Sequence, residues 1–179
     1  MPSEPCRAST RPVIAIDPGI TGAIAVLNDR GGLIEILDMP TSVVTVSGKV
    51  RNVVSAPLLA TMIRAHDPSE VWLEKVNARP GEGPAGAFSF GRGVGVIEGV
   101  VATLGLPLTT VIPAVWKKAM RCPADKDGAR TRAMQLFPTS ADLFKRKKDD
   151  GRAEAAMLGR FALGLGEQNR TSRARSNAP

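Results

Sequence analysis

The hydrophobic positions of the chain form short apolar runs at the start and helical repeats further on. Three apolar runs, at residues 12–17, 23–27 and 33–38, are separated only by turns rich in Gly, Pro and Asn. Short runs joined by such turns are typical of three antiparallel strands in a meander. Residues 40–50 are rich in Thr, Ser and Val, and we predict that they form a loop.

After residue 50 the apolar positions recur at the three- and four-residue spacing of helices, with two further strand-like runs between them. Helices are predicted over 51–65, 87–104, 113–120, 128–137 and 153–165, and strands over 70–76 and 108–112. This order resembles that of a ribonuclease-H-like α/β domain. The expected fold is a mixed five-stranded sheet, with three antiparallel meander strands and two parallel ones, flanked by helices. The domain is expected to span residues 12–166, between a disordered leader (1–11) and a disordered basic tail (167–179).

Composition and charge narrow the class of protein. The 179 residues are 43% hydrophobic and only 4% aromatic, which indicates an aliphatic core and excludes a disordered chain. The net charge of +7, from 24 Lys+Arg against 17 Asp+Glu, favours a polyanionic partner such as nucleic acid. Two cysteines and one histidine do not suffice for a zinc site without carboxylates. We expect a reduced, cytoplasmic setting and no membrane association, because no apolar run has the length of a membrane span.

Four acids in three distant segments are the candidate catalytic residues. Asp17 ends the first predicted strand, and Glu74 interrupts an apolar strand in which alternation places it on the same face as Trp72. Asp150 and Glu154 are four residues apart, so a helix would place them on one face, about 6 Å apart. Each acid also has an ordinary interpretation: an acid at a strand end, a surface glutamate on an edge strand, and the cap of a solvated helix.

In the predicted ribonuclease-H-like arrangement these four acids lie close together. The ordinary interpretation of each acid is then less favoured than a shared site. Carboxylates that lie close together repel one another unless cations compensate them, and two divalent ions about 4 Å apart are a common solution. Such a pair activates water for attack on a phosphodiester without a histidine or serine nucleophile. Lysines near the acids in sequence are candidate phosphate contacts, although any of them can equally be a solvated surface charge: Lys117, Lys118, Lys126, and Lys145, Lys147 and Lys148.

The predicted helix 87–104 is unusual in its glycines. Each glycine in a helix costs about 1 kcal/mol relative to alanine, so the spacing suggests close approach of another backbone. The sheet, a partner subunit and DNA are all possible neighbours of the helix. The glycines concerned are Gly91, Gly93, Gly95 and Gly99.

Together these segments resemble the RuvC-type Holliday junction resolvases, most closely the branch with the plant chloroplast resolvase and bacterial or phage relatives. The matching segments are Ile16-Asp17-Pro18-Gly19 with Gly22-Ala23, Leu73-Glu74-Lys75, Phe88-Ser89-Phe90-Gly91, Val115-Trp116-Lys117, Asp125-Lys126-Asp127, Leu136-Phe137-Pro138 and the run from Lys147 to Ala155. The resemblance covers roughly residues 12–165.

The resemblance implies a homodimeric endonuclease, dependent on Mg²⁺ or Mn²⁺, that nicks two strands of a four-way DNA junction symmetrically. Asp17, Glu74, Asp150 and Glu154 would carry the metals, with Asp149 as a rival to Asp150. The corresponding DNA-binding residues would be Lys117, Lys126, Lys147 and Lys148. Either Phe88 or Phe90 would stack on junction bases, although both also fit the apolar core stripe of a helix.

Two other functions are compatible with the sequence. A catalytically silent protein that binds branched DNA is possible, although uncompensated carboxylates would weaken its binding. A fragment of an actin-like ATP phosphotransferase shares the turn after Asp17, but that fold needs a second lobe and a longer chain.

Overall fold

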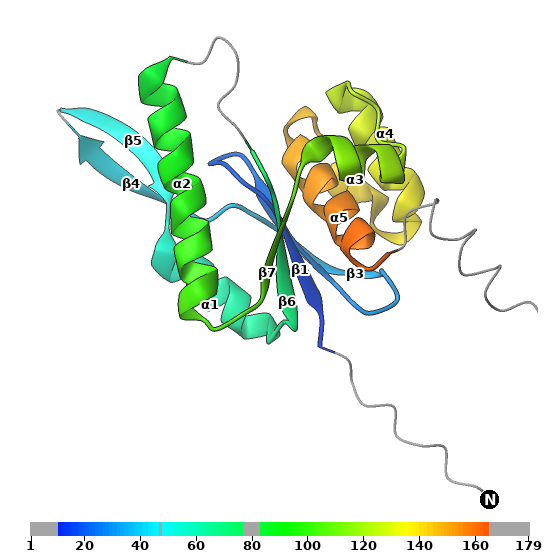
Figure 1. The fold of residues 1–179 in the computed structure, drawn as a ribbon. Helices are drawn as coiled ribbons and strands as arrows, with labels where there is room; N and C mark the ends of the chain where they lie inside the picture. The colour runs from blue at the N-terminus through cyan, green and yellow to red at the C-terminus, as the bar shows by residue number, and fades with distance from the viewer. Residues whose placement is uncertain (1–10, 47, 77–82, 165–179) are drawn as a thin grey trace, which may run out of the picture.

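A five-stranded mixed sheet forms the centre of the molecule (Figure 1). The computed structural model describes residues 11–46, 48–76 and 83–164, so the leader and the basic tail predicted from sequence lie outside the described residues, apart from Arg11. The strand order is β3-β2-β1-β6-β7. The strands are β1 (Val13–Asp17), β2 (Ala23–Leu27), β3 (Leu33–Asp38), β6 (Glu70–Glu74) and β7 (Leu108–Val111). The β1–β2 and β2–β3 pairs are antiparallel and the β1–β6 and β6–β7 pairs are parallel, which confirms the predicted sheet.

Helices cover both faces of this sheet (Figure 1). Helices α1 (Ala56–His66) and α2 (Pro84–Thr103) lie on one face. On the other face lie α3 (Pro113–Met120), α4 (Lys126–Leu136) and α5 (Asp150–Ala162), with the short 3₁₀ helices η1 (Pro138–Phe144) and η2 (Lys147–Asp149) between α4 and α5. In the part of the chain that the structure describes, no helix is long and apolar enough to cross a membrane.

The prediction of a loop at residues 40–50 is wrong, and so is the prediction that the first helix begins at residue 51. Residues Thr41–Val46 form β4 and Lys49–Val54 form β5, which pair as a separate two-stranded hairpin. Gly48, with φ of +72°, lies in the turn between them. The helix begins only at Ala56, because Pro57 is accepted in the first turn of a helix but not in its interior. The β-branched residues of this stretch favour strands, which is the physical reason for the hairpin.

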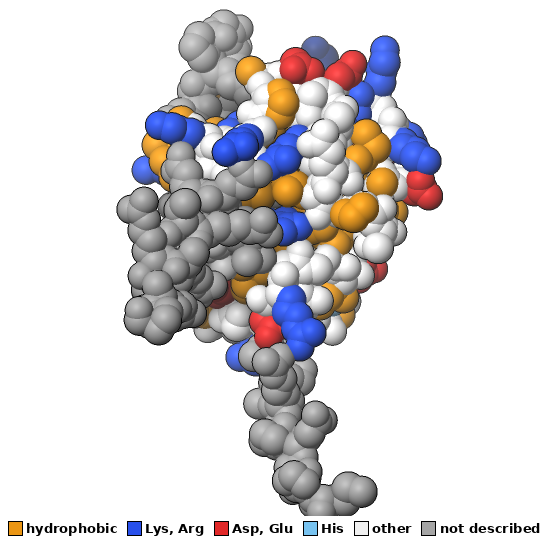
Figure 2. Space-filling view, turned by 90° about the vertical axis from the view of Figure 1, so that its right-hand side faces the viewer, with side chains coloured by type: hydrophobic (Ala, Val, Ile, Leu, Met, Phe, Trp, Pro, Cys, Tyr) orange, Lys and Arg blue, Asp and Glu red, His pale blue; other side chains and the backbone are white. Residues whose placement is uncertain are grey.

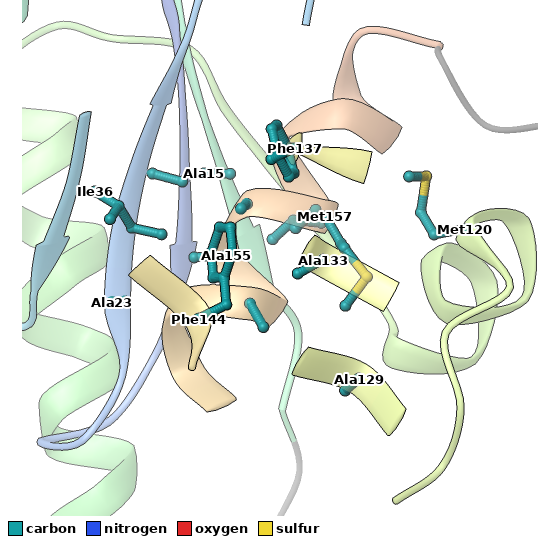
Figure 3. Close-up of a cluster of buried hydrophobic side chains, with 14 of the residues drawn as sticks. Ala15, Ala23, Ile36, Met120, Ala129, Ala133, Phe137, Phe144, Ala155 and Met157 are labelled. Atoms are coloured by element: carbon teal, nitrogen blue, oxygen red, sulfur yellow. The ribbon is translucent and has the colours of Figure 1, made fainter. Parts of the chain in front are cut away.

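The two faces of the sheet carry side chains of different size. Ile14 and Ile16 on β1 pack with Ile24 and Val26 on β2 against α1 and α2. Towards α5 the same strands present the small residues Ala15, Ala23 and Ala25, all fully buried, and α5 meets them with three alanines, Ala153, Ala155 and Ala156 (Figure 3). Small residues on both sides allow α5 to lie close to β1 and β2, and this close packing brings the acids of α5 to the strand ends.

Candidate metal centre

Asp17 and Glu74 lie at the ends of neighbouring parallel strands and on the same face of the sheet. The register pairs Ile16 of β1 with Leu73 of β6, so the two acids are the next residue on each strand. Side chains alternate along a strand, so Asp17 shares the face of Ala15, and Glu74 shares that of Trp72, which packs in the cluster beneath α5. The predicted placement of these acids on the face that α5 covers is therefore found in the structure.

Helix α5 brings Glu154 to the same point. At Gly151 the helix passes so close to the β1–β2 turn that a Cβ there would lie 2.8 Å from the Thr21 carbonyl oxygen and 2.9 Å from Asp17 Oδ2. Glu154 lies one turn further along α5. Asp17, Glu74 and Glu154 can each place a carboxylate oxygen within 4.8 Å of the other two. Three acids that are distant in sequence thus form one cluster.

An open cleft of about 390 Å³ exposes this cluster to solvent. Its walls come from the end of β1, the end of β6, the start of α3 and the start of α5. The lining residues include all four predicted acids and two of the predicted lysines: Asp17, Glu74, Asp150, Glu154, Lys117 and Lys126. A phosphate group of a substrate can therefore reach the carboxylates from outside.

The electrostatics of the cluster favour a bound cation. Burial raises the pKa of Asp17 well above its ordinary value, and the neighbouring carboxylates of Glu154 and Glu74 raise the pKa further. Glu74 is also buried, with 7% of its surface exposed, and accepts a hydrogen bond of 3.0 Å from Trp116 Nε1. Clustered carboxylate oxygens around an open position are the ligands that Mg²⁺ and Mn²⁺ prefer, so these residues fit a divalent metal.

Two lysines partly compensate the acids. Lys117 Nζ lies 2.9 Å from Glu154 Oε1, and Lys126 Nζ forms an ion pair with Asp150 Oδ2. Burial by itself lowers the pKa of Lys117, but the hydrogen bond to Glu154 and the charge of that carboxylate outweigh burial and raise the pKa. Lys117 is therefore held as a cation at the mouth of the cleft.

The structure separates the two rivals for the third acidic position. Asp150 lines the cleft, whereas Asp149 has only 1% of its surface exposed and forms ion pairs away from the cleft. Asp149 accepts hydrogen bonds from the backbone N–H of Arg146 (2.8 Å) and from its guanidinium (2.8 and 3.0 Å). It also lies 3.9 Å from Arg152 Nε, and Arg152 binds Asp38 on β3 at 2.6 and 2.8 Å. The alternative that Asp150 caps the helix is wrong, because Asp149 holds the cap position and Asp150 is the first helical residue.

We expect Asp149→Asn to lower the free energy of unfolding by about 2 kcal/mol at neutral pH, because it weakens charge-assisted hydrogen bonds at a buried site. Burial would raise the pKa of Asp149, but the hydrogen bonds from Arg146 hold it below its ordinary value. The stabilisation is therefore present above the unfolded pKa of about 4 and is lost as the pH falls through the folded pKa. Urea unfolding at several pH values should show the difference from wild type shrinking on acidification. Asp142→Asn, which removes an exposed ion pair with Lys145, is the matched control and should change little.

The remaining predicted DNA-binding residues lie outside the carboxylate cleft. Lys147 and Lys148 are exposed on η2, just before α5. Figure 2 shows Lys and Arg side chains on the upper part of the face over α3, α4 and α5. Phe88, with 75% of its surface exposed, lies on α2 on the other side of the sheet. His66 Nε2 lies 3.0 Å from a carboxylate oxygen of Glu35, and neither residue lines the carboxylate cleft.

Three of the four α2 glycines that the sequence singled out have open space beside them. A Cβ at Gly91, Gly95 or Gly99 would meet no atom of the described residues within 4 Å. Of the neighbours suggested by the sequence, the sheet is thus excluded for these three positions, and a partner subunit and DNA remain. The sequence marked Trp116 as part of a short helix and of a matching segment, but it gave no sign of the hydrogen bond from Trp116 to Glu74.

No protein-family model and no curated protein sequence matches this chain. Among solved structures, it is similar to Thermus thermophilus RuvC in complex with a Holliday junction substrate, with a TM-score of 0.57 and 16% identity over 87% of this chain and 97% of that one. A second T. thermophilus RuvC structure gives a TM-score of 0.51 at 17% identity, covering 87% of this chain and 98% of that one. The yeast mitochondrial Holliday junction resolvase Ydc2 gives 0.50 at 12% identity, covering 96% and 86%.

The chain therefore has a RuvC-like, ribonuclease-H-like α/β fold, as the sequence segments indicated. At these identities the similarity establishes the fold alone.

Proposed function

We propose that this protein is a metal-dependent endonuclease that resolves four-way (Holliday) DNA junctions by paired, symmetric hydrolysis of phosphodiester bonds. The observation that carries the proposal is the convergence of Asp17, Glu74 and Glu154 from three segments into one open cleft. Lysines flank that cleft, and the fold around it is the RuvC fold. An acidic cluster on a basic chain is expected for a protein that both binds DNA and cuts it.

Asp17, Glu74, Glu154 and Asp150 are the residues that would hold Mg²⁺, or Mn²⁺ in its place. The metal would supply an activated water and stabilisation of the leaving oxygen. Trp116 fixes the orientation of Glu74 through its hydrogen bond. Lys117 and Lys126, which pair with Glu154 and Asp150 in this structure, lie where they can turn to a phosphate once those carboxylates have another partner.

Symmetric nicking of two strands needs two cutting centres, and the described residues of one chain hold a single acidic cluster of this kind. We therefore infer that the protein acts as a homodimer. The open face of α2, with Gly91, Gly95 and Gly99 and the exposed Phe88, is the candidate surface for the second copy. Light scattering should show a dimer at the concentrations that support cleavage. Gly95→Leu should dissociate it, whereas a wild-type monomer that makes paired cuts would contradict the inference.

The proposal is tested with Mg²⁺, a labelled four-way junction and a linear duplex of the same sequence. We expect cuts at symmetric positions on the junction alone, and no cuts when the metal is chelated. Binding without product would support the silent branched-DNA-binding protein, and ATP turnover would support the actin-like alternative.

Junction binding should weaken steeply with salt if Lys117, Lys126, Lys147 and Lys148 contact phosphates. Each phosphate contact adds roughly one unit to the slope of log affinity against log salt concentration. A titration between low and moderate salt measures that slope, and Lys147→Gln with Lys148→Gln should reduce it by about two. A slope that is flat in the wild type would show that these lysines do not contact DNA.

A further inference from the structure

A row of three residues crosses the sheet from the carboxylate cleft to the edge strand β3. Asp17 of β1 is paired with Ala23 of β2, and Ala23 is paired with Asp38, the last residue of β3. Residues directly opposite one another on neighbouring strands share a face, so Asp38 lies on the face that α5 covers. Two strand spacings separate Asp38 from Asp17, about 10 Å. The end of β3 is therefore aligned with the cleft, although none of the described residues that line the cleft comes from β3.

Helix α5 is attached to the far end of this row by Arg152. The Nε of Arg152 lies 2.6 Å from Asp38 Oδ1 and its Nη2 lies 2.8 Å from Asp38 Oδ2, so the guanidinium and the carboxylate form a two-pronged fork. Such a fork fixes orientation as well as distance. The preceding residue, Gly151, lies against Asp17 and Gly22 at the other end of the row. The start of α5 is therefore held at two points across the sheet, by close packing at β1 and by an ion pair at β3.

The position of Arg152 on α5 relates this fork to the acids of the cleft. Arg152 is two residues from Asp150 and two residues from Glu154. A helix turns about 100° per residue, so Arg152 projects from nearly the opposite side of α5 to both acids. Any rotation of α5 about its axis moves all three side chains by the same angle. A fork that fixes Arg152 at β3 therefore also fixes the direction in which the two acids point.

Burial distinguishes this ion pair from an ordinary surface pair. The side chain of Arg152 is only 17% exposed, and its Nε also lies 3.9 Å from the buried carboxylate of Asp149. The side chain of Asp38 is 66% exposed, so the fork can be removed at Asp38 without opening the core. Exposed carboxylates in ion pairs contribute little to stability. What the fork contributes is the orientation of α5.

We propose that Arg152 is a positioning residue for the candidate metal centre and acts through its fork to Asp38. The fork sets the rotation of α5, and that rotation directs Asp150 and Glu154 into the carboxylate cleft. This inference rests on the proposed function and goes further, because it gives the edge strand β3 a part in metal binding. Without the fork the two acids would take a wider range of directions and bind a divalent metal more weakly.

Binding of Mn²⁺ to the full chain without DNA tests the proposal, with free Mn²⁺ followed by its electron paramagnetic resonance signal. Asp38→Ala removes both acceptors of the fork, and Arg152→Lys keeps the charge but has no planar guanidinium. Each change is expected to weaken Mn²⁺ binding about tenfold, and to slow single-turnover junction cleavage at limiting Mn²⁺ by a similar factor. Because both changes remove the same contact, the two together should weaken Mn²⁺ binding no more than either alone.

Glu35→Ala is the matched control, because it removes a carboxylate from the same strand. Glu35 is three residues before Asp38, so it projects from the other face of the sheet, and its carboxylate lies beside His66. Glu35→Ala should bind Mn²⁺ as the wild type does. Urea unfolding of both alanine variants shows whether the chain is folded, and we expect Asp38→Ala to unfold near the wild-type midpoint.

Equal Mn²⁺ affinity in Asp38→Ala and Glu35→Ala would overturn the proposal. So would effects of Asp38→Ala and Arg152→Lys that add in the double variant, since two residues that act through one fork cannot lose it twice. An Asp38→Ala variant with a lowered unfolding midpoint and unchanged Mn²⁺ affinity would show a structural role alone and would also overturn it. Failure of the proposed function is a different result, in which the wild-type chain leaves the junction uncut whatever its Mn²⁺ affinity.

Discussion

Asp17→Asn and Glu74→Gln are each expected to reduce junction cleavage by about 10³-fold or more, while junction binding stays equal or tightens. Each change removes a negative charge from the point where phosphate must approach, and each removes a ligand from the candidate metal centre. Single-turnover cleavage with Mg²⁺ and binding measured without cleavage give the two readouts. A variant that loses cleavage but keeps junction binding has lost the chemistry and not the fold.

The control for this pair lies on the same strand as Glu74. Glu70 begins β6, at the opposite end from the cleft, so Glu70→Gln removes the same charge without touching the centre. It should cleave at the wild-type rate. A chain carrying both Asp17→Asn and Glu74→Gln that still cuts at a normal rate would refute the assignment of these residues.

Gly151→Leu is expected to abolish cleavage and to lower the free energy of unfolding by about 3 kcal/mol. A side chain at this position would press against the Thr21 carbonyl, the Asp17 carboxylate and the backbone at Gly22, which lies 3.1 Å from the ideal Cβ. The helix would have to move away from the strand ends, and overpacking of this kind typically costs 1–3 kcal/mol, occasionally more. Urea unfolding and single-turnover cleavage measure the two effects.

Gly83→Ser is the matched glycine control. Nothing lies within 4 Å of a Cβ at Gly83, and serine is favoured at the cap position that Gly83 holds before α2. Stability and cleavage should both stay at or slightly above wild type. A Gly151→Leu variant as stable and active as Gly83→Ser would mean that α5 does not need its close approach to β1.

The sheet and most helices were predictable because their signals are local. Apolar runs and turn residues define β1, β2 and β3, and the acid at the end of β1 follows from the same pattern. The hairpin of β4 and β5 was not predicted, since its strands form a separate two-stranded sheet with exposed valines such as Val43 and Val50. Strands without a buried face lack the alternation on which the prediction relies.

For the candidate site, residue types and strand faces could be predicted, but the ion-pair partners could not. The four-residue spacing of Asp150 and Glu154 fits one helix face, but the sequence does not show where the side chain of the neighbouring Asp149 lies. Only the three-dimensional arrangement shows Asp149 turned towards Arg146 and Arg152. Likewise, the hydrogen bond from Trp116 to Glu74 joins residues 42 positions apart, a distance at which no local pattern operates.

The metal centre is tested most directly by a crystal structure of the chain grown with Mn²⁺, with the metal located by its anomalous scattering. We predict manganese bound to carboxylate oxygens of Asp17, Glu74 and Glu154, with Lys117 displaced from Glu154. A cleft that binds no manganese at millimolar concentration, with Lys117 still paired to Glu154, would contradict it.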